Sequence, residues 1–238
     1  MATASKRITR KQLRQPDWFQ VTTENALEFY RANQTKVLVI AGVLIVLLLA
    51  VWAFQQFKEQ QNSAASEEFR RAMTLFQVQN YRDAVPAFKK VQGYRWSRYA
   101  SLAYLYETNS YLALNDSVKA KASAERFIAT TSSDSLFRQI GLLDLATAEE
   151  RNSNCKQAIE HYAEAERINA PFKERALLGK ARCAQQLGDT TTALAAYRDY
   201  LKDHPGSYVA LEVAQLEAKN RPNQLQNSHR YRPAERLH

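Results

Sequence analysis

The chain has 238 residues, including six glycines, six prolines and two cysteines, and a formal net charge of +9 at pH 7. Most of this charge lies at the two ends: residues 1–36 hold seven basic and three acidic side chains, and residues 221–238 hold four arginines and one glutamate. Residues 37–220 are nearly neutral, which excludes the broad basic face of a nucleic-acid-binding domain. The scarcity of glycine and proline, with abundant Ala, Leu, Glu and Gln, predicts an all-α protein.

The first 36 residues form a basic segment that we expect to lie in the cytoplasm. Thr22 or Thr23 is placed to cap a short helix over residues 24–33. The aromatic side chains of this segment would lie in the membrane interface, while its basic residues contact lipid headgroups. A docking element for a cytoplasmic or membrane partner is the alternative interpretation.

Residues 37–57 carry no charged side chain and are bracketed by Lys36 and Lys58. As a helix they would span about 31 Å, close to the thickness of a bilayer's hydrocarbon core. Trp52 suits the membrane interface at one end. The run is longer than that of a cleaved signal peptide, and no small-x-small cleavage site follows it directly, so we predict an uncleaved transmembrane helix. The basic flank places the N-terminus inside and the remaining chain across the membrane.

Beyond Lys58 the sequence repeats a helix–turn–helix pattern. A small residue in the first helix allows the second to approach closely, a glycine tolerates the left-handed turn, and an aromatic residue fills the remaining gap. The fourth unit shows the pattern best, with Leu177, Ala181, Gly188, Ala193, Tyr197 and the closing Pro205. The third unit has Leu142, Ala146, Ala158 and Tyr162 at positions 35 residues earlier, followed by Pro171. The first unit has Ala72, Tyr81, Ala84 and Phe88.

The second unit follows the pattern less closely. Asp116 is placed to cap a helix over residues 117–130, and Phe127 falls 39 residues after the aromatic of unit one. Ser123 stands where the pattern has alanine, and the preceding helix, at about residues 96–114, has no clean Gly or Ala at the close-contact position. Either the register slips in this unit, or an insertion of a few residues separates units one and two.

The sequence predicts one further helix and a tail. Residues 207–219 place Val209, Val213 and Leu216 on one face, as expected of a helix that caps the end of a repeat stack. Residues 221–238 show no apolar periodicity, and we expect a disordered basic tail.

These units resemble tetratricopeptide repeats over residues 58–220. The order of a short basic segment, one anchor and a repeat domain also resembles the ancillary SecYEG translocon subunit family, membrane-anchored periplasmic proteins of bacteria. The resemblance implies an all-α solenoid of about four helix pairs plus a capping helix, on the periplasmic side of the bacterial inner membrane. It also implies a role beside the translocon, with exported polypeptides, the translocon or periplasmic chaperones as partners. This chain differs from that family in its longer N-terminal segment and basic C-terminal extension.

We find no sequence signature of catalysis. Zinc-ligand spacing, a phosphate-binding glycine loop, a nucleophile elbow and a dinucleotide fingerprint are all missing from the sequence. His161 with Glu164, three residues later, is more typical of a solvated helix face than of a metal site. We therefore predict no enzyme activity, no cofactor and no metal.

Cys155 and Cys183 form a candidate disulfide. Cys155 begins the second helix of unit three and Cys183 lies near the end of the first helix of unit four, and these helices run antiparallel around a turn near residue 170. Both cysteines therefore lie at nearly the same height. An oxidising compartment permits a disulfide if the Cα atoms approach within about 7 Å, whereas two small buried thiols are the alternative.

Aromatic residues suggest where a partner could bind. Tyr99 and Tyr106 share one helix face, and Tyr104 and Tyr111 share another. One pair is expected in the core, while the other could line the concave groove in which tetratricopeptide stacks receive extended peptides. Core packing of all these aromatics is the alternative. The candidate groove residues are Phe69, Met73, Phe76, Trp96, Tyr99, Tyr104, Tyr106 and Tyr111.

We therefore expect a non-catalytic, membrane-tethered scaffold that binds proteins outside the cytoplasmic membrane, in protein export or periplasmic chaperoning. Tethering raises its effective concentration near membrane partners, so weak contacts can suffice. A structural adaptor of an envelope or secretion complex that binds no clients is the alternative. The expected partners are proteins, and membrane lipid through residues 37–57 and the basic N-terminal segment, but not nucleic acid.

Overall fold

A computed structural model describes residues 22–23 and 28–230, with side chains described up to residue 219. The chain divides into two units, Met1–Phe57 and Lys58–His238.

The described part of the first unit is helical. Residues 28–32 form the end of a short helix, and helix α2 (Gln34–Gln77) begins directly after it. Thr22 and Thr23 have helical backbone, so neither is the predicted N-cap, and residues 24–27 lie outside the described residues. The apolar window of α2 contains no buried residue, and α2 is the one helix in the described ranges that is long and apolar enough to cross a membrane.

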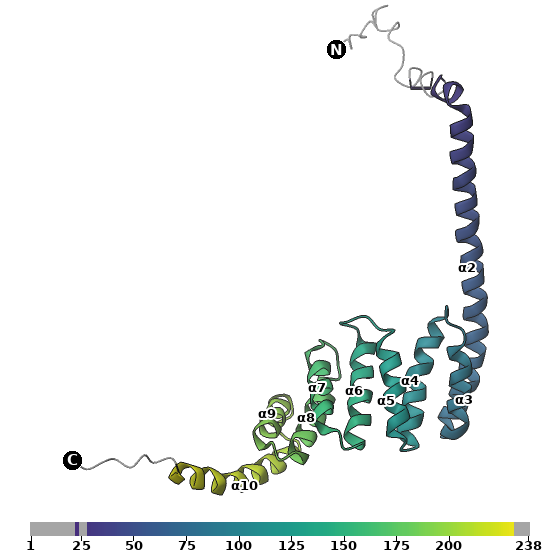
Figure 1. Cartoon of the computed structure of the whole chain (residues 1–238). Helices are drawn as coiled ribbons and strands as arrows, with labels where there is room; N and C mark the ends of the chain where they lie inside the picture. The colour runs from purple at the N-terminus through teal and green to yellow at the C-terminus, as the bar shows by residue number, and fades with distance from the viewer. Residues whose placement is uncertain (1–21, 24–27, 231–238) are drawn as a thin grey trace, which may run out of the picture. The chain divides into compact units, whose positions relative to one another are not determined.

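The second unit, as far as Arg230, consists of the end of α2 and eight further helices (Figure 1). These are α3 (Tyr81–Gln92), α4 (Arg98–Ala113), α5 (Ser117–Ile128), α6 (Leu136–Arg151), α7 (Cys155–Arg167), α8 (Lys173–Gln186), α9 (Thr190–Asp203) and α10 (Val209–Arg230). The part of the chain that the structure describes contains no strand, which confirms the predicted all-α class.

The helices of this unit pack as four successive pairs and a final helix. The pairs are the end of α2 with α3, α4 with α5, α6 with α7, and α8 with α9, and α10 packs on α9. Helix α6 contacts α4 and α8 as well as α5 and α7, so the first helices of the pairs form an inner row. This arrangement confirms the predicted solenoid with a capping helix.

The turn inside each pair has the same geometry. It is three residues long, and its middle residue adopts a left-handed backbone, at Gln79 (φ 60°), Asn115 (φ 58°), Ser153 (φ 60°) and Gly188 (φ 77°). The next residue then donates its N–H to the carbonyl five residues back, at 2.8–2.9 Å in all four turns. This hydrogen bond is that of a Schellman C-cap, which satisfies a carbonyl at the end of the first helix. The left-handed residue therefore marks the register of every unit.

This register corrects the alignment of the second unit. A fully buried alanine lies five residues after each left-handed position, at Ala84, Ala120, Ala158 and Ala193. Ala120, rather than Ser123, is therefore the small residue of unit two. Ala124 occupies the position that is aromatic in the other units, so Phe127 was aligned one helical turn too late. Buried Thr108 takes the close-contact position in the first helix.

The slipped register is thus the correct alternative, and an insertion between units one and two is wrong. The connection between those units, residues 93–97, has the same length as residues 168–172 between units three and four. The longer connection, residues 129–135, lies between units two and three.

Aromatic side chains of second helices pack against the first helix of the next pair. The ring of Tyr162 lies directly over Gly179, where a Cβ atom would be only 2.3 Å from the Tyr162 Cζ atom. Phe88 stacks on Tyr106 in the same way, with ring centroids 5.6 Å apart. Gly179 is therefore required by the close approach of an aromatic ring, rather than by backbone conformation.

Helix α10 is longer than the predicted capping helix. Val209 and Val213 are buried and Leu216 is half-buried against the preceding pair, as predicted for a cap. The backbone stays helical to Arg230, which differs from the expectation of disorder from residue 221. Apolar periodicity reports a buried face, whereas Gln, Leu and Arg favour helical backbone even without one. Residues 231–238 lie outside the described residues.

Candidate functional site

The predicted groove residues lie in three different environments. Five of them fill the space between α2, α3 and α4, packed around Phe88: Phe69, Met73, Phe76, Tyr99 and Tyr106. Ring centroids are 5.3 Å apart for Phe69 and Tyr99, and 5.3 Å for Phe76 and Tyr106. This aromatic cluster is half-buried and joins the first pair of helices to the second.

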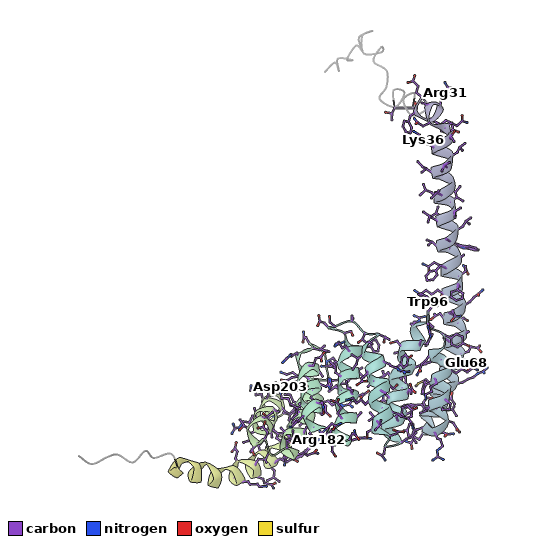
Figure 2. The ribbon with its side chains drawn as sticks, in the orientation of Figure 1. Arg31, Lys36, Glu68, Trp96, Arg182 and Asp203 are labelled. Atoms are coloured by element: carbon purple, nitrogen blue, oxygen red, sulfur yellow. The ribbon has the colours of Figure 1, made fainter. Side chains whose placement is uncertain are left out.

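The other three predicted residues are not part of this cluster's core. Tyr104 is half-buried, and its carbonyl accepts hydrogen bonds from the Thr108 and Ser123 hydroxyls. Trp96 is 55% exposed and lies just before α4, at the edge of the stack where that helix begins (Figure 2). Tyr111 is buried and lines a polar pocket. The structure therefore does not gather the eight residues into one groove.

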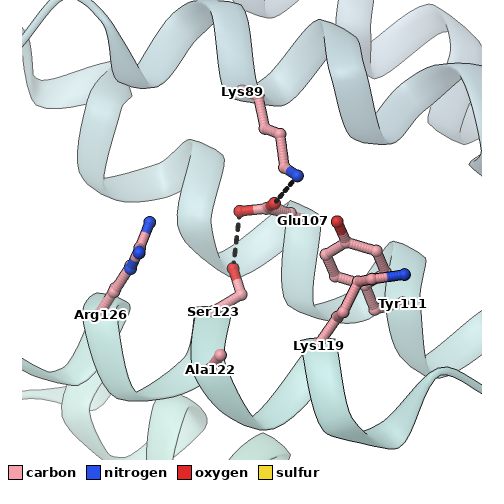
Figure 3. A pocket seen from close by; sticks show the side chains of 7 residues that line it. All are labelled: Lys89, Glu107, Tyr111, Lys119, Ala122, Ser123 and Arg126. Carbon is pink, nitrogen blue, oxygen red and sulfur yellow. Dashed lines mark hydrogen bonds and ion pairs between the residues drawn. The ribbon is translucent and has the colours of Figure 1, made fainter.

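The polar pocket opens between α3, α4 and α5 and has a volume of about 160 Å³ (Figure 3). Its lining residues are Lys89, Glu107, Tyr111, Lys119, Ala122, Ser123 and Arg126. The two lysine Nζ atoms each lie 5.7 Å from the centroid of the Tyr111 ring, at cation–π distance. Three positive side chains therefore surround one buried carboxylate and one aromatic ring.

Glu107 is held by neutral donors as well as by charge. Its Oε2 atom accepts hydrogen bonds from Gln92 Nε2 at 2.6 Å and Ser123 Oγ at 2.8 Å. Lys89 Nζ lies 3.8 Å from its Oε1 atom. The Tyr111 hydroxyl, and with it Glu107, raises the pKa of the Lys89 ammonium. Ser123, which the sequence pattern placed at an expected alanine position, thus anchors α5 to α4 through the Glu107 carboxylate.

Arg126 is the pocket cation with no acidic partner within the described ranges, since Lys119 binds Asp116 at 2.6 Å and Lys89 approaches Glu107. In Figure 3 its side chain stands apart from Glu107, and no dashed line joins it to another residue. Arg126 is therefore available to an acidic group of another molecule.

The inner row of helices carries two arginine–carboxylate pairs. Arg175 of α8 contacts Asp144 Oδ1 of α6 at 3.0 Å. Arg182 of α8 binds both carboxylate oxygens of Glu150 at 2.9 and 3.0 Å, and Tyr162 donates to the same group at 2.6 Å. Burial favours a raised pKa, but Arg182 and Tyr162 hold the pKa of Glu150 below its usual value. Both arginines of this face are thus already neutralised by α6.

Asp144 is the most perturbed carboxylate of the inner row. It is almost completely buried, and its Oδ2 atom has no hydrogen-bond partner among the described residues. Burial raises the pKa of Asp144 to about 6, although Arg175 and Asn109 act in the opposite direction. Asp144 therefore titrates in a mildly acidic range.

His161 has a different partner from the one considered in the sequence. Its Nδ1 atom lies 2.7 Å from Glu149, a fully buried residue of α6, and Lys121 of α5 contacts the same carboxylate at 2.9 Å. Glu164 instead pairs with Arg138 at 2.8 Å. No group of three metal-ligating side chains occurs in the residues that the structure describes. Glu149 therefore links α5, α6 and α7 as a structural group.

The two cysteines lie side by side across the boundary between units three and four, as their spacing indicated. Both are buried free thiols with Sγ atoms 2.8 Å apart, and Cys155 also lies 2.9 Å from Gln186 Oε1. Burial raises the pKa of the Cys183 thiol, so that it is protonated at neutral pH. The disulfide itself stays a prediction.

Comparison with known proteins agrees with this architecture. The family model of the tetratricopeptide repeat-like domain matches residues 28–219. The chain belongs to this family. Two solved structures of nearly identical tetratricopeptide-like repeats from a putative kinesin light chain of Podosopora anserina are similar to it, with TM-scores of 0.56 and 0.55. Both are 16% identical and cover 70% of this chain, and the chain covers 91% and 92% of theirs.

At this identity the likeness of the kinesin light chain repeats shows the tetratricopeptide fold alone. No curated protein sequence matches the chain. Tetratricopeptide-like folds are typically non-catalytic scaffolds for protein–protein interaction. The charged side chains of the helix stack form pairs between helices, which suits a structural scaffold.

Proposed function

We propose that this protein is a membrane-tethered tetratricopeptide scaffold that binds other proteins outside the cytoplasmic membrane, without catalysing a reaction on them. The observation that carries the proposal is the apolar window near the start of α2, which contains no buried residue and precedes the helix stack in the chain. Exposing that many Leu, Ile and Val side chains to water is unfavourable by about 25 cal/mol per Å², whereas a bilayer accommodates them. The basic segment before it favours a cytoplasmic N-terminus.

Assistance to protein export is the finer form of this proposal. It rests on the order of basic segment, anchor and repeat domain, which resembles the ancillary SecYEG translocon subunits. The partners would be exported polypeptides, the translocon or periplasmic chaperones, and the location would be the periplasmic side of the bacterial inner membrane.

Membrane topology is the first test. After alkaline carbonate extraction the full chain should stay with the membrane pellet. Protease added to spheroplasts should degrade the helix stack and leave a short N-terminal fragment protected. A chain released by carbonate would refute the tether, and a stack protected from external protease would refute the orientation.

Site-specific photocrosslinking then tests partner binding. A photoreactive residue in place of half-exposed Arg175, on the inner row, should capture partners. The matched control is exposed Glu160 on the outer helix α7, which should capture few. Many different exported chains captured at position 175 would support a client-binding scaffold, one stoichiometric partner would support the structural adaptor, and equal capture at both positions would refute binding by the inner row.

A further inference from the structure

One edge of the helix stack combines exposed aromatic and basic side chains. This edge carries two of the connections between pairs, residues 93–97 and 129–135, whereas the opposite edge carries the three-residue turns inside the pairs. Trp96 is 55% exposed, and Leu136 and Phe137 are 42% and 48% exposed. The same residue types, large apolar rings beside arginines, are typical of proteins at a membrane interface.

This edge carries positive charge that acidic side chains do not neutralise. Residues 90–98 and 126–138, which include the two connections and the helix ends beside them, hold five basic side chains and one acidic side chain, and two of the basic ones, Lys90 and Arg138, pair with Glu68 and Glu164. Arg95 and Arg98 have no acidic partner among the described residues, and Arg98 lies against the Tyr99 ring. The opposite edge is balanced, with Arg82 beside Asp83 and Lys119 bound to Asp116. Anionic groups are therefore attracted to one edge and not to the other.

An apolar hollow of about 380 Å³ lies within the positive edge. Its lining includes the apolar side chains of Leu102, Phe127 and Phe137, and Arg98 and several hydroxyl groups complete it. A surface of this kind matches a lipid headgroup region, where apolar contact, phosphate charge and hydrogen-bond acceptors occur together.

The same edge lies near the start of the second unit, which follows the apolar run in the chain. Lys58 is the first charged residue after the apolar run, and Asn62 lies about one helical turn further along α2. Ser97, in the first connection, donates a hydrogen bond to Asn62 Oδ1 at 3.1 Å. Trp96 is thus within a short distance of the point where the chain enters the proposed bilayer.

We propose that this edge, comprising Trp96, Arg95, Arg98, Leu136 and Phe137, docks on the anionic lipid surface next to the anchor. The inference rests on the proposed membrane tether, which supplies the bilayer. Docking holds the stack against the membrane by its connections and leaves the inner row of helices accessible to proteins.

Tryptophan fluorescence of the full chain in vesicles tests the docking. The chain has three tryptophans, so the variant W18F/W52F retains Trp96 alone. In vesicles of phosphatidylcholine and phosphatidylglycerol, lipids brominated near the headgroup should quench Trp96 and lipids without bromine should not. The control V118W, in a chain with all native tryptophans replaced, places an equally exposed probe on the opposite edge. This probe should not be quenched, because the 16-residue helix α4 separates the two edges by about 24 Å.

A second probe separates failure of the docking from failure of the tether. The variant W18F/W96F reports on Trp52, within the apolar run, which should be quenched in brominated vesicles whether or not the edge docks. Quenching of Trp52 without quenching of Trp96 would overturn the docking and leave the tether intact, whereas absence of both would overturn the tether. Quenching of Trp96 and the V118W probe alike would also overturn docking by one edge. Charge reversal by Arg95→Glu together with Arg98→Glu should reduce the quenching of Trp96 and leave the quenching of Trp52 unchanged. Unchanged quenching of Trp96 would overturn the role of the arginines.

Discussion

The contact between Tyr162 and Gly179 makes a sharp prediction about stability. In Gly179→Ala the new Cβ atom would lie 2.3 Å from Cζ and 2.4 Å from Cε1 of the ring. The ring cannot move aside easily, because it is 1% exposed and its hydroxyl donates to Glu150 at 2.6 Å. Overpacking of this kind costs up to about 3 kcal/mol, and the higher helix propensity of alanine returns about 1 kcal/mol. We therefore expect a net loss of about 2 kcal/mol.

Thermal unfolding of the full chain, followed by circular dichroism in detergent, measures this loss. For a domain of this size, about 2 kcal/mol lowers Tm by roughly 4–8 °C. Gly206→Ala is the matched control, because no atom lies within 4 Å of its new Cβ, and Tm should stay the same. Gly141→Ala should be intermediate, since its Cβ would meet Ile128 Cγ1 at 2.8 Å and Phe127 Cδ1 at 2.9 Å, which are longer distances than those to the Tyr162 ring.

A double variant shows whether the ring itself causes the loss. Tyr162→Leu removes the ring atoms that the new Cβ would meet, so Gly179→Ala should cost less in that background, with a coupling energy of about 1 kcal/mol or more. Equal Tm values for Gly179→Ala and Gly206→Ala, or additive effects of the two changes, would refute the packing argument.

Three further predictions concern pH, turns and thiols. Burial raises the pKa of Asp144 from 3.8 to about 6, so its stabilising contribution is complete below about pH 4 and is lost as the pH rises through 6. The variant D144N should therefore be more stable than the wild type at pH 7.5, by up to about 3 kcal/mol, and equally stable at pH 4. Urea titrations at both pH values measure this difference. Gln79→Gly and Ser153→Gly relieve left-handed backbone and should each stabilise by about 1 kcal/mol in the same titrations, whereas no gain at either position would contradict the turn geometry. Copper phenanthroline oxidation of Cys155 and Cys183 should raise stability by about 3 kcal/mol and dithiothreitol should reverse the gain, and persistence of the effect in Cys183→Ser would argue against this pair.

The sequence was sufficient to predict the pairs of helices in units three and four. Gly188 marks the turn of unit four, and Ser153 is the corresponding residue of unit three. Tyr197 follows Gly188 at the same distance as Tyr162 follows Ser153. In unit two the same turn is made by Asn115, a residue type that tolerates left-handed backbone but also occurs in many other conformations. With the turn unrecognised, Phe127 was taken for the repeat aromatic, although the aromatic position holds Ala124. The register of a repeat thus follows from backbone geometry that several residue types can satisfy.

The candidate site was less predictable, because helical periodicity identifies faces but not their neighbours. Tyr99 and Tyr106 were correctly placed on one face, yet only the packing of α2 and α3 shows that this face meets Phe88. The buried carboxylates gave a weaker signal still. Glu107 lies between buried Ala and Tyr positions of α4, and such an acid within an apolar stretch is the pattern that would have revealed it.

Helix α6 explains how similar helix pairs stack in only one order. Its carboxylates Asp144, Glu149 and Glu150 each bind a cation on a neighbouring pair, Arg175, Lys121 and Arg182 respectively, at distances of 2.9–3.0 Å. The alanines and aromatics that fill the pair contacts recur in every unit and would accept one another in several arrangements. A buried carboxylate would not accept another arrangement, because the free-energy cost of losing its partner exceeds the stabilisation that the pair provides. Exchanging the pairs on either side of α6 would strand these three acids, so the repeated apolar contacts supply stability while the acids of one central helix select the order.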